Sequence, residues 1–284
     1  MTLATTRRRL DAELVRRRLV ASRALAQEAI ASGLVTVDGA PAFKAATQVT
    51  AQQALVVAGP PRAYVSRGGD KLAHALEVFD VDPAGRHAMD AGVSTGGFTD
   101  CLLQRGAVRV LAYDVGYGQL HGSLRTDPRV VLRERTNVRS LTAEDVPPPA
   151  PDLLVADLSF ISLSLVLPGL RPLLAAEAEA VVLVKPQFEA ERGEVGAGGI
   201  VRDPAVWRRA LERVAGTGAS LRWQVSGATA SPLLGSKGNV EFLLHLTTAG
   251  APEHLAAPAL EAAVAEGIER RRAAGSASTT GRPG

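Results

Sequence analysis

The chain has 284 residues, 46% of them hydrophobic and 21% charged, which is enough for one ordinary globular domain together with a smaller one. Its formal net charge is only +3, and its single cysteine, Cys101, excludes an internal disulfide or a cysteine cluster that binds metal. Apolar runs such as residues 181–184 are far too short to span a bilayer, and the basic opening residues are not followed by the apolar core of a secretory signal, so we expect a cytoplasmic protein with no membrane partner and no metal.

The first sixty residues predict a small module of two helices followed by a hairpin. Leu10, Leu14 and Leu19 suggest one helix, and Ser22 is a typical N-cap for a second helix that stops at a glycine. Residues 34–39 then have the pattern of a strand and a turn.

This module is strongly basic. Residues 1–62 contain nine Lys or Arg against four Asp or Glu, a net charge of +5 that leaves −2 for the rest of the chain. Arginine clusters on small helices suit a phosphate backbone, although any one cluster could equally form a solvated helix face. The asymmetry favours nucleic acid as a partner. The candidate RNA contacts are Arg7, Arg8, Arg16, Arg17, Arg18, Arg23, Lys44 and Arg67.

Beyond this module, strand-like runs alternate with helical ones, which predicts an α/β domain with a largely parallel sheet. The last two runs are close enough in sequence to form a terminal antiparallel hairpin. The strand-like runs are 110–113, 130–132, 153–157, 181–185, 221–225 and 240–246. The predicted boundaries are 1–59 for the basic module, 60–65 for a linker containing Pro60-Pro61, 66–250 for the α/β domain, and 251–284 for a helix over 258–272 followed by a disordered tail from 273.

The most informative stretch, residues 89–100, has the pattern of a strand end, a glycine turn and a helix start, which is how a doubly wound α/β sheet holds a nucleoside cofactor. Its glycines let the backbone turn tightly and approach a ligand. An acidic residue, Asp114, ends the next strand-like run at the spacing where a carboxylate meets ribose hydroxyls. The candidate cofactor contacts are Asp90, Gly92, Ser94, Thr95, Gly96, Gly97, Phe98, Asp114, Asn137 and Asp157.

The same stretch also matches Gly-x-Ser-x-Gly, the nucleophile elbow of esterases, with Ser94 as the nucleophile. The chain has no His-Gly-Gly-Gly run for an oxyanion hole, and His245 lies inside an apolar run typical of a strand. A hydrolase is therefore the weaker alternative.

Four charged residues stand at the ends or entrances of the predicted elements, where open α/β sheets build their sites. They are Lys71, Asp157, Lys185 and Glu241. Each taken singly could be an ordinary salt-bridge partner or a snorkelling lysine. Two lysines and two acids converging on one pocket instead favour catalysis.

At this point the chain resembles the TlyA family of ribosomal RNA 2′-O-methyltransferases. The resemblance spans roughly residues 7–246 and rests on five motifs in order. They are Asp90-Ala-Gly-Val-Ser-Thr-Gly-Gly-Phe-Thr-Asp100, Asp114-Val-Gly-Tyr-Gly-Gln-Leu120, Ala156-Asp-Leu-Ser-Phe-Ile-Ser-Leu163, Val184-Lys-Pro-Gln-Phe-Glu189 and Gly238-Asn-Val-Glu-Phe242. The family joins an RNA-binding domain of the ribosomal-protein S-four type to an FtsJ-like, Rossmann-like methyltransferase domain.

The resemblance implies S-adenosyl-L-methionine as the cofactor, and cytidine 2′-hydroxyls of 16S and 23S rRNA in ribosomal subunits as the targets. Members with a full arginine-bearing N-terminal helix, as here, are associated with both targets. Relatives also carry the name haemolysin, but this sequence shows no segment suited to opening a membrane. A ribosome-binding factor without catalysis is the alternative that keeps the basic module.

The four charged residues match the Lys-Asp-Lys-Glu tetrad of FtsJ-like enzymes. A ribose hydroxyl is a poor nucleophile, so a base must take its proton, and a lysine can do so only when its pKa is lowered, for example by a second ammonium. We assign Lys185 as the base, Lys71 as the neighbouring cation, and Asp157 and Glu241 as orienting carboxylates.

The remaining expectations concern the surroundings of the cofactor and the base. The glycine turn should face the methionine portion, Asp114 the ribose, and Asn137 the adenine. Phe188 either stacks on the extruded cytosine or packs under the sheet. Residues 193–199 form either a mobile lid or an ordinary loop.

Overall fold

The computed structural model describes residues 7–20, 22–58, 63–235, 237–248 and 256–279, and the chain divides into two compact units between Ala63 and Tyr64. Each unit has a hydrophobic core of its own. Pro60-Pro61, expected in the linker, lies outside the described residues.

The N-terminal unit packs two helices against short strands. β2 is the centre of a three-stranded antiparallel sheet of order β3-β2-β5, and β1 pairs with β4. The hairpin expected at residues 34–39 is confirmed, because Asp38 and Gly39 both have the positive φ of a type I′ turn. The elements are β1 Arg8–Arg9, α1 Leu10–Arg16, α2 Arg23–Ala31, β2 Val35–Val37, β3 Ala40–Pro41, β4 Gln48–Val49 and β5 Leu55–Val57.

The predicted helix starts and stops in this unit are only partly correct. Ser22 is the N-cap of α2, and its hydroxyl accepts a hydrogen bond from Leu25 N at 3.3 Å, as expected. The inclusion of Leu19 in the first helix is wrong: α1 ends at Arg16, Arg18 has φ +58°, and Leu19 is 41% exposed. A left-handed residue ends a helix, so the leucine beyond it points away from the core.

The second unit contains a seven-stranded sheet of order β11-β12-β10-β9-β6-β7-β8. β6 to β10 run parallel, and β12 is antiparallel to both β10 and β11, so the predicted parallel sheet with a terminal antiparallel hairpin is confirmed. The strands are β6 His87–Ala91, β7 Arg109–Tyr113, β8 Val130–Arg133, β9 Leu153–Ala156, β10 Glu179–Val184, β11 Gln224–Ala230 and β12 Phe242–Thr247. The helices are α3 Arg67–Phe79, α4 Gly97–Gln104, α5 Gly122–Arg125, α6 Leu163–Leu170, α7 Pro186–Glu189, α8 Pro204–Ser220 and α9 Ala256–Thr279.

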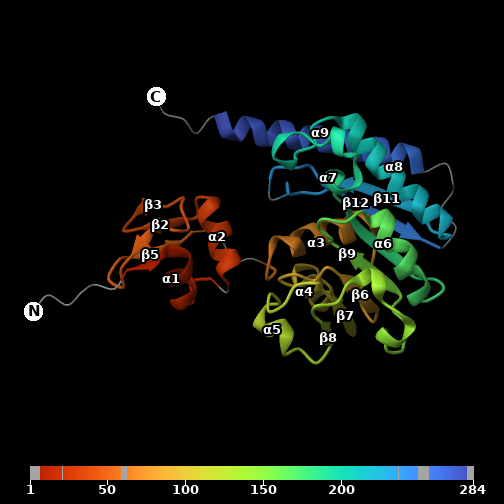
Figure 1. Ribbon diagram of the computed structural model, residues 1–284, viewed down its shortest axis with the longest axis horizontal. Coiled ribbons are helices and arrows are strands. Elements are labelled where there is room, and N and C mark those ends of the chain that lie inside the picture. Colours follow the sequence, from red (N-terminus) through yellow and green to blue (C-terminus); the bar gives the residue numbers. More distant parts are fainter. Residues whose placement is uncertain (1–6, 21, 59–62, 236, 249–255, 280–284) are drawn as a thin grey trace, which may run out of the picture. The chain divides into compact units, whose positions relative to one another are not determined.

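Helices cover both faces of this sheet (Figure 1). Successive strand residues point to opposite faces, so Ala88 and Val110 pack with α3 and α4, whereas Met89 and Leu111 belong to the core beneath α6, α8 and α9. Both faces are buried, which explains the nearly continuous apolar runs in the parallel strands. The carboxyl ends of these strands are left to build a site.

Two boundaries of this unit differ from the sequence prediction. The strand expected from residue 221 begins at Gln224, because residues 221 and 222 turn the chain out of α8 and Arg222 has φ +62°. The C-terminal helix extends to Thr279, so the tail expected from residue 273 is helical as far as the structure describes it. Its alanines are strong helix formers, which outweighed the low-complexity composition.

Candidate active site

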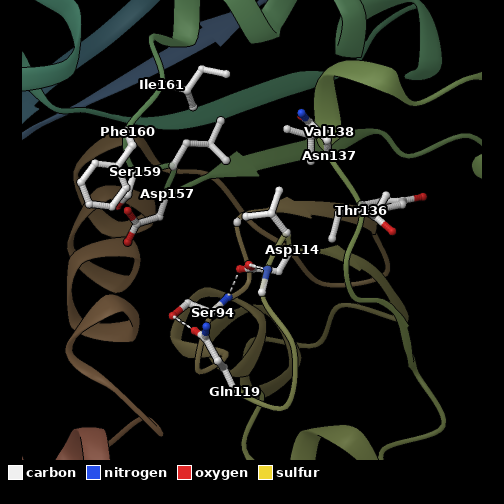
Figure 2. Close-up of a pocket in the computed structure, with 15 residues that line it drawn as sticks. Ser94, Asp114, Gln119, Thr136, Asn137, Val138, Asp157, Ser159, Phe160 and Ile161 are labelled. Atoms are coloured by element: carbon white, nitrogen blue, oxygen red, sulfur yellow. Dashed lines mark hydrogen bonds between the residues drawn. The ribbon is translucent and has the colours of Figure 1, made fainter.

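A cavity of about 430 Å³ opens at the carboxyl edge of the parallel sheet (Figure 2). Its walls come from the segments that follow β6, β7, β8 and β9, because parallel strands end at the same edge. Its volume is in the range of small-molecule sites. The lining residues are Gly92, Ser94, Tyr113, Asp114, Val115, Gly116, Gln119, Thr136, Asn137, Val138, Asp157, Leu158, Ser159, Phe160 and Ile161.

Asp114 joins the segments after β6 and β7. Its Oδ2 accepts a hydrogen bond from Ser94 N at 2.7 Å, drawn in Figure 2, and its Oδ1 accepts from Gly116 N at 2.6 Å. An ionised carboxylate has about four acceptor sites, so both oxygens can still accept from a ligand in the cavity. The carboxylate is thus fixed in position and can still accept hydrogen bonds from a ligand.

Gly92 allows the segments after β6 and β9 to approach each other. It has φ +94°, and a Cβ at this position would lie 2.6 Å from the carbonyl oxygen of Asp157. Any other residue would push apart the two strand ends that flank the cavity.

Some of the predicted cofactor residues line the cavity and others do not. The cavity is lined by five of them, namely Gly92, Ser94, Asp114, Asn137 and Asp157. The other five predicted residues do not line it, namely Asp90, Thr95, Gly96, Gly97 and Phe98.

Packing constrains several of these residues, and their contact with the cofactor remains a prediction. Phe98 is buried in the core. A Cβ on Gly97 would lie 2.3 Å from Ser66 Oγ, and one on Gly96 would lie 2.3 Å from the Leu124 side chain.

Asp90 is a fully buried carboxylate below the glycine turn. Thr99 Oγ1 donates to its Oδ2 at 2.6 Å, and no hydrogen-bond partner of Oδ1 occurs within the described residues. Burial raises the pKa of Asp90 to about 7, and the nearby charge of Asp157 adds to the shift.

The four charged residues of the predicted tetrad form two ion pairs. Lys185 Nζ lies 2.6 Å from Asp157 Oδ1 and donates to Ser159 Oγ at 3.0 Å. Lys71 Nζ lies 2.5 Å from Glu241 Oε2, and both of these side chains are buried. Each lysine is therefore paired with its own carboxylate. From the sequence, Lys71 was expected to be a neighbouring cation that lowers the pKa of Lys185.

A second cavity of about 290 Å³ adjoins the first. The two share Ser159 and Phe160, and Lys185 and Glu241 line the second. The Asp157–Lys185 pair therefore stands where the cavities meet. The other lining residues are Gln187, Phe188, Val195, Gly199, Lys237 and Asn239.

Two aromatic rings stand in the wall of the second cavity. The ring centroids of Phe160 and Phe188 are 5.3 Å apart, and Lys185 Nζ lies 5.9 Å from the Phe188 centroid. Phe160 is 91% exposed and has φ +65°. Phe160 did not emerge as a site residue from the sequence, because a phenylalanine beside an apolar run is indistinguishable from a core residue until its exposure is known.

The loop expected as a lid is tied to the sheet at its far end. The buried Asn239 donates from Nδ2 to Gly199 O and accepts at Oδ1 from Val201 N, each at 2.9 Å. Glu194 near its start pairs with Arg209 of α8. Its mobility remains a prediction.

The esterase alternative finds no support in the site. Ser94 Oγ donates to Gln119 Oε1 at 3.4 Å, and no histidine of the described segments hydrogen-bonds to Ser94. His121 contacts Ser123, and His245 pairs with Glu179 at the start of β10.

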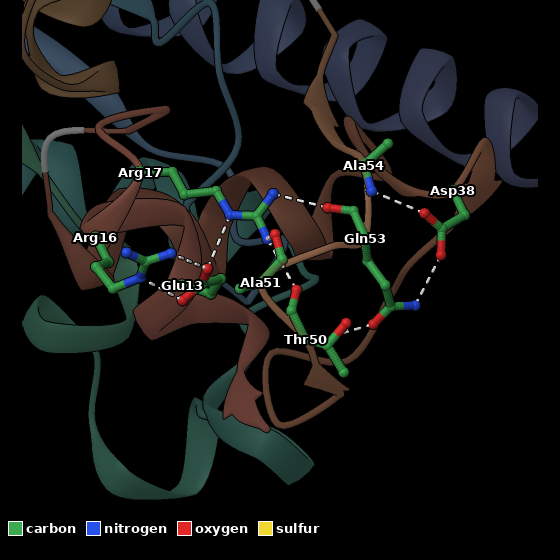
Figure 3. A network of polar contacts seen from close by, with 8 residues as sticks. All are labelled: Glu13, Arg16, Arg17, Asp38, Thr50, Ala51, Gln53 and Ala54. Atoms are coloured by element: carbon green, nitrogen blue, oxygen red, sulfur yellow. Dashed lines mark hydrogen bonds and ion pairs between the residues drawn. The ribbon is translucent and has the colours of Figure 1, made fainter. Parts of the chain in front are cut away.

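In the N-terminal unit, the predicted RNA contacts differ in how many hydrogen bonds and ion pairs they make within the protein. Arg17 is mostly buried: its guanidinium binds Glu13 at 2.8 Å and the carbonyl oxygens of Thr50, Ala51 and Gln53 at 2.8, 3.0 and 2.7 Å (Figure 3). Its assignment as a phosphate contact is therefore corrected to a structural role. Four of the five N–H donors of this guanidinium are used within the unit, so moving the side chain to a phosphate would break these contacts.

The other arginines near this helix keep exposed surface. Arg16 pairs with the buried Glu13 at 2.6 Å and Arg23 with the buried Asp11 at 3.0 Å, yet both arginine side chains are about half exposed. The Arg16 hydrogen bond lowers the pKa of Glu13 to about 2. These buried acids hold the arginines in fixed positions.

The remaining predicted RNA contacts divide between the two units. Those of the N-terminal unit are exposed side chains, namely Arg7, Arg8, Arg18 and Lys44. Arg67 lies in the second unit, where its Nη2 donates to Leu234 O at 2.6 Å.

The described ranges contain neither a cluster of metal ligands nor a membrane-spanning helix. There, no group of three or more His, Cys, Asp or Glu is placed to hold a metal ion, and no helix is long and apolar enough to cross a membrane.

Family comparisons match both units. Residues 64–248 match the FtsJ-like methyltransferase model, and residues 8–55 match the S4 domain model. The chain is similar to the 16S/23S rRNA (cytidine-2′-O)-methyltransferase TlyA of Mycobacterium tuberculosis, with 53% identity over 92% of this chain and 97% of the relative. It is also 46% identical to YqxC, a candidate rRNA methyltransferase of Bacillus subtilis, over 86% of this chain and 87% of that one.

Among solved structures, the fold is similar to that of a candidate hemolysin from Streptococcus thermophilus. The TM-score is 0.77 at 36% identity, covering 96% of this chain and 100% of that one.

Proposed function

Because this chain belongs to the TlyA family of FtsJ-like methyltransferases, we propose that it transfers a methyl group from S-adenosylmethionine to the 2′-hydroxyl of cytidines in 16S and 23S rRNA. The observation that carries the proposal is the meeting of two cavities at the Asp157–Lys185 pair. One cavity suits a nucleoside cofactor, and the other suits a nucleotide of the substrate. Acting on ribosomal RNA, the enzyme works in the cytoplasm.

The residues of the larger cavity fit S-adenosylmethionine. Asp114 has acceptor capacity left for the two ribose hydroxyls, and Asn137 offers an amide at the opposite end of the lining for the adenine. Gly92 keeps the wall free of a side chain where the methionine portion would pass. When bound, the cofactor supplies an electrophilic methyl group on a sulfonium.

Lys185 is the residue best placed to take the proton of the attacking hydroxyl. It lines the second cavity, whereas Lys71 lines neither cavity. Asp157 fixes the direction of the Lys185 side chain from the first cavity, and Ser159 Oγ accepts a hydrogen bond from it. The Lys71–Glu241 pair supports this arrangement from α3 and from the start of β12.

The target base is expected at the two phenylalanines. Phe160 presents an exposed ring at the junction of the cavities, tilted against Phe188. Aromatic faces hold flipped bases by stacking, which compensates for part of the unstacking cost. The Phe188 ring lies close enough to Lys185 for a base stacked at this pair of rings to bring its own ribose to the lysine.

The N-terminal unit supplies the affinity for ribosomal RNA. Phosphate contacts dominate such affinity and need exposed cations. We assign them to Arg7, Arg8, Arg16, Arg18, Arg23 and Lys44.

The test is transfer of tritiated methyl groups from S-adenosylmethionine to unmodified ribosomal subunits, with the modified nucleotide mapped by primer extension. We expect incorporation at cytidine 2′-hydroxyls of both subunits. Lys185→Ala should abolish transfer while calorimetry shows cofactor affinity within a few-fold of wild type, because a base acts in the transition state. Arg208→Ala, on the solvent side of α8, is the matched control and should be fully active.

Binding of subunits without any methyl transfer would refute the enzyme assignment and leave a ribosome-binding factor. Methyl transfer by folded Lys185→Ala at the wild-type rate would refute only the identity of the base.

A further inference from the structure

A buried carboxylate connects the two segments that carry the catalytic ion pair. Glu189 ends α7, in the turn that begins at Lys185, and is only 2% exposed. Its Oε2 accepts from Ser162 Oγ at 2.5 Å, and its Oε1 accepts from Leu163 N at 2.7 Å. Ser162 closes the segment that begins at Asp157.

Each of these two segments is anchored at an end that meets the other. In the Lys185 turn, Phe188 N donates to Lys185 O and Ala190 N to Pro186 O, both at 2.8 Å. On the other side, Leu163 starts helix α6, which is anchored in the core. Glu189 therefore links the hydrogen-bonded Lys185 turn to the anchored start of α6.

The contact is more than a helix cap. Ser162 already caps α6, because its Oγ accepts from Ser164 N at 3.1 Å. Burial raises the pKa of Glu189, which marks the cost of enclosing this carboxyl group, while the two donors counteract the shift. Glu189 accepts from a different amide, Leu163 N, and also from the capping hydroxyl itself, so one buried carboxylate on the Lys185 turn holds both the end of the Asp157–Ser162 segment and the start of α6.

We propose that Glu189 is a positioning residue that fixes the Lys185 turn against the Asp157–Ser162 segment, and so sets the base relative to the methyl-acceptor hydroxyl. The inference rests on the proposed function. Methyl transfer requires the hydroxyl, the base and the methyl carbon in line, and a misplacement of about 1 Å can cost about a hundredfold in rate.

The first test is Glu189→Gln. The amide oxygen can still accept from Leu163 N, but the amide nitrogen cannot accept from Ser162 Oγ, so the Ser162 hydroxyl loses its charged acceptor and the link is weakened. We expect kcat to fall about ten- to hundredfold, with the Kd for S-adenosylmethionine within twofold, since Glu189 does not line the cofactor cavity. The matched control is Glu194→Gln, which loses an ion pair to α8 in the same stretch of chain but no contact to Ser162, and should keep its kcat.

The second test is a double-variant cycle with Ser162→Ala, which also serves if Glu189→Gln does not fold. Ser162→Ala removes one of the two hydrogen bonds and should lower kcat less than Glu189→Gln does. The double variant should be no slower than Glu189→Gln alone, because both changes break the same link.

Hydrogen exchange provides a readout that does not depend on activity. In Glu189→Gln, we expect faster exchange in peptides covering both 157–165 and 185–190, with unchanged exchange in β6 and β7. An inactive wild type would refute the proposed function while leaving this measurement to decide on the link.

Three results would overturn the inference. They are a kcat of Glu189→Gln within twofold of wild type, equal losses of kcat in Glu189→Gln and Glu194→Gln, or additive effects in the Ser162 cycle.

Discussion

Glu241 stands next to Lys185 across the β10–β12 ladder, whose register pairs Val184 with Phe242, yet its carboxylate binds Lys71. This buried ion pair links α3 to the residue that directly precedes β12, at the lining of the second cavity. The other lysine keeps the more open position, facing the second cavity.

Removal of Lys71 is expected to cost stability as well as activity. Lys71→Met leaves the buried Glu241 carboxylate without its partner, and breaking such a pair typically costs about 3–5 kcal/mol. The double variant Lys71→Met/Glu241→Leu should recover most of this loss, because it removes both charges. Urea denaturation measures both. Arg208→Met, at an exposed pair, should cost about 1 kcal/mol or less; an equal cost for Lys71→Met would show that its pair is not a buried one in solution.

Asp114 should determine cofactor affinity. Loss of a charged hydrogen bond costs about 1.5–3 kcal/mol, so Asp114→Asn should weaken S-adenosylmethionine binding by roughly 10- to 150-fold in calorimetry. Glu134→Gln is the control, since this carboxylate also accepts from a backbone amide, Gly118 N, but does not line the cavity. Unchanged affinity of folded Asp114→Asn would place the ribose elsewhere.

Asp90 should make the stability of the enzyme depend on pH. Its folded-state pKa of about 7 lies above the unfolded value, so the native state holds the proton more tightly, and this contribution is complete below about pH 4 and lost as the pH rises through 7. Asp90→Asn mimics the protonated form. The free energy of unfolding of the variant relative to wild type should therefore rise by up to about 4 kcal/mol between pH 4 and pH 8. A difference that stays constant over this range would contradict the assignment.

The arginines of the N-terminal unit should separate into two classes. Arg17→Ala should destabilise that unit, because it removes one of the two arginines bound to the buried Glu13 and the hydrogen bonds to the carbonyl oxygens of residues 50, 51 and 53. Arg16→Ala together with Arg18→Ala should weaken RNA binding, reducing the salt dependence by about one unit of slope per lost phosphate contact, and should destabilise the unit less than Arg17→Ala does, because Glu13 keeps Arg17 as its partner. Anisotropy titrations against salt measure the second effect and thermal melts the first. An unchanged slope would show that these arginines form a solvated helix face and do not contact RNA.

Much of this architecture follows from local sequence. The alternation of apolar runs predicted the parallel sheet, and the strand ends predicted where Asp114, Asp157 and Lys185 would stand, because a strand's carboxyl end fixes the next residue. The N-cap at Ser22 was equally local.

Other features depend on contacts between distant residues. Arg17 looks like its neighbours in sequence, and only the loop at residues 50–53 makes it structural. Gly97 looked like a ligand contact because glycine turns commonly are, but the packing of α3 against α4 requires it. The exposure of Phe160 and the partners of Glu189 were likewise set by tertiary structure.

The position of β12 has a consequence for synthesis of the protein. β12 is the last strand in sequence but lies between β10 and β11, so β11 cannot join the sheet until β12 has been inserted. Glu241 and the loop-holding Asn239 arrive with that same strand. A nascent chain on the ribosome can therefore bury most of its core early but acquires a complete catalytic centre only when the final hairpin leaves the exit tunnel.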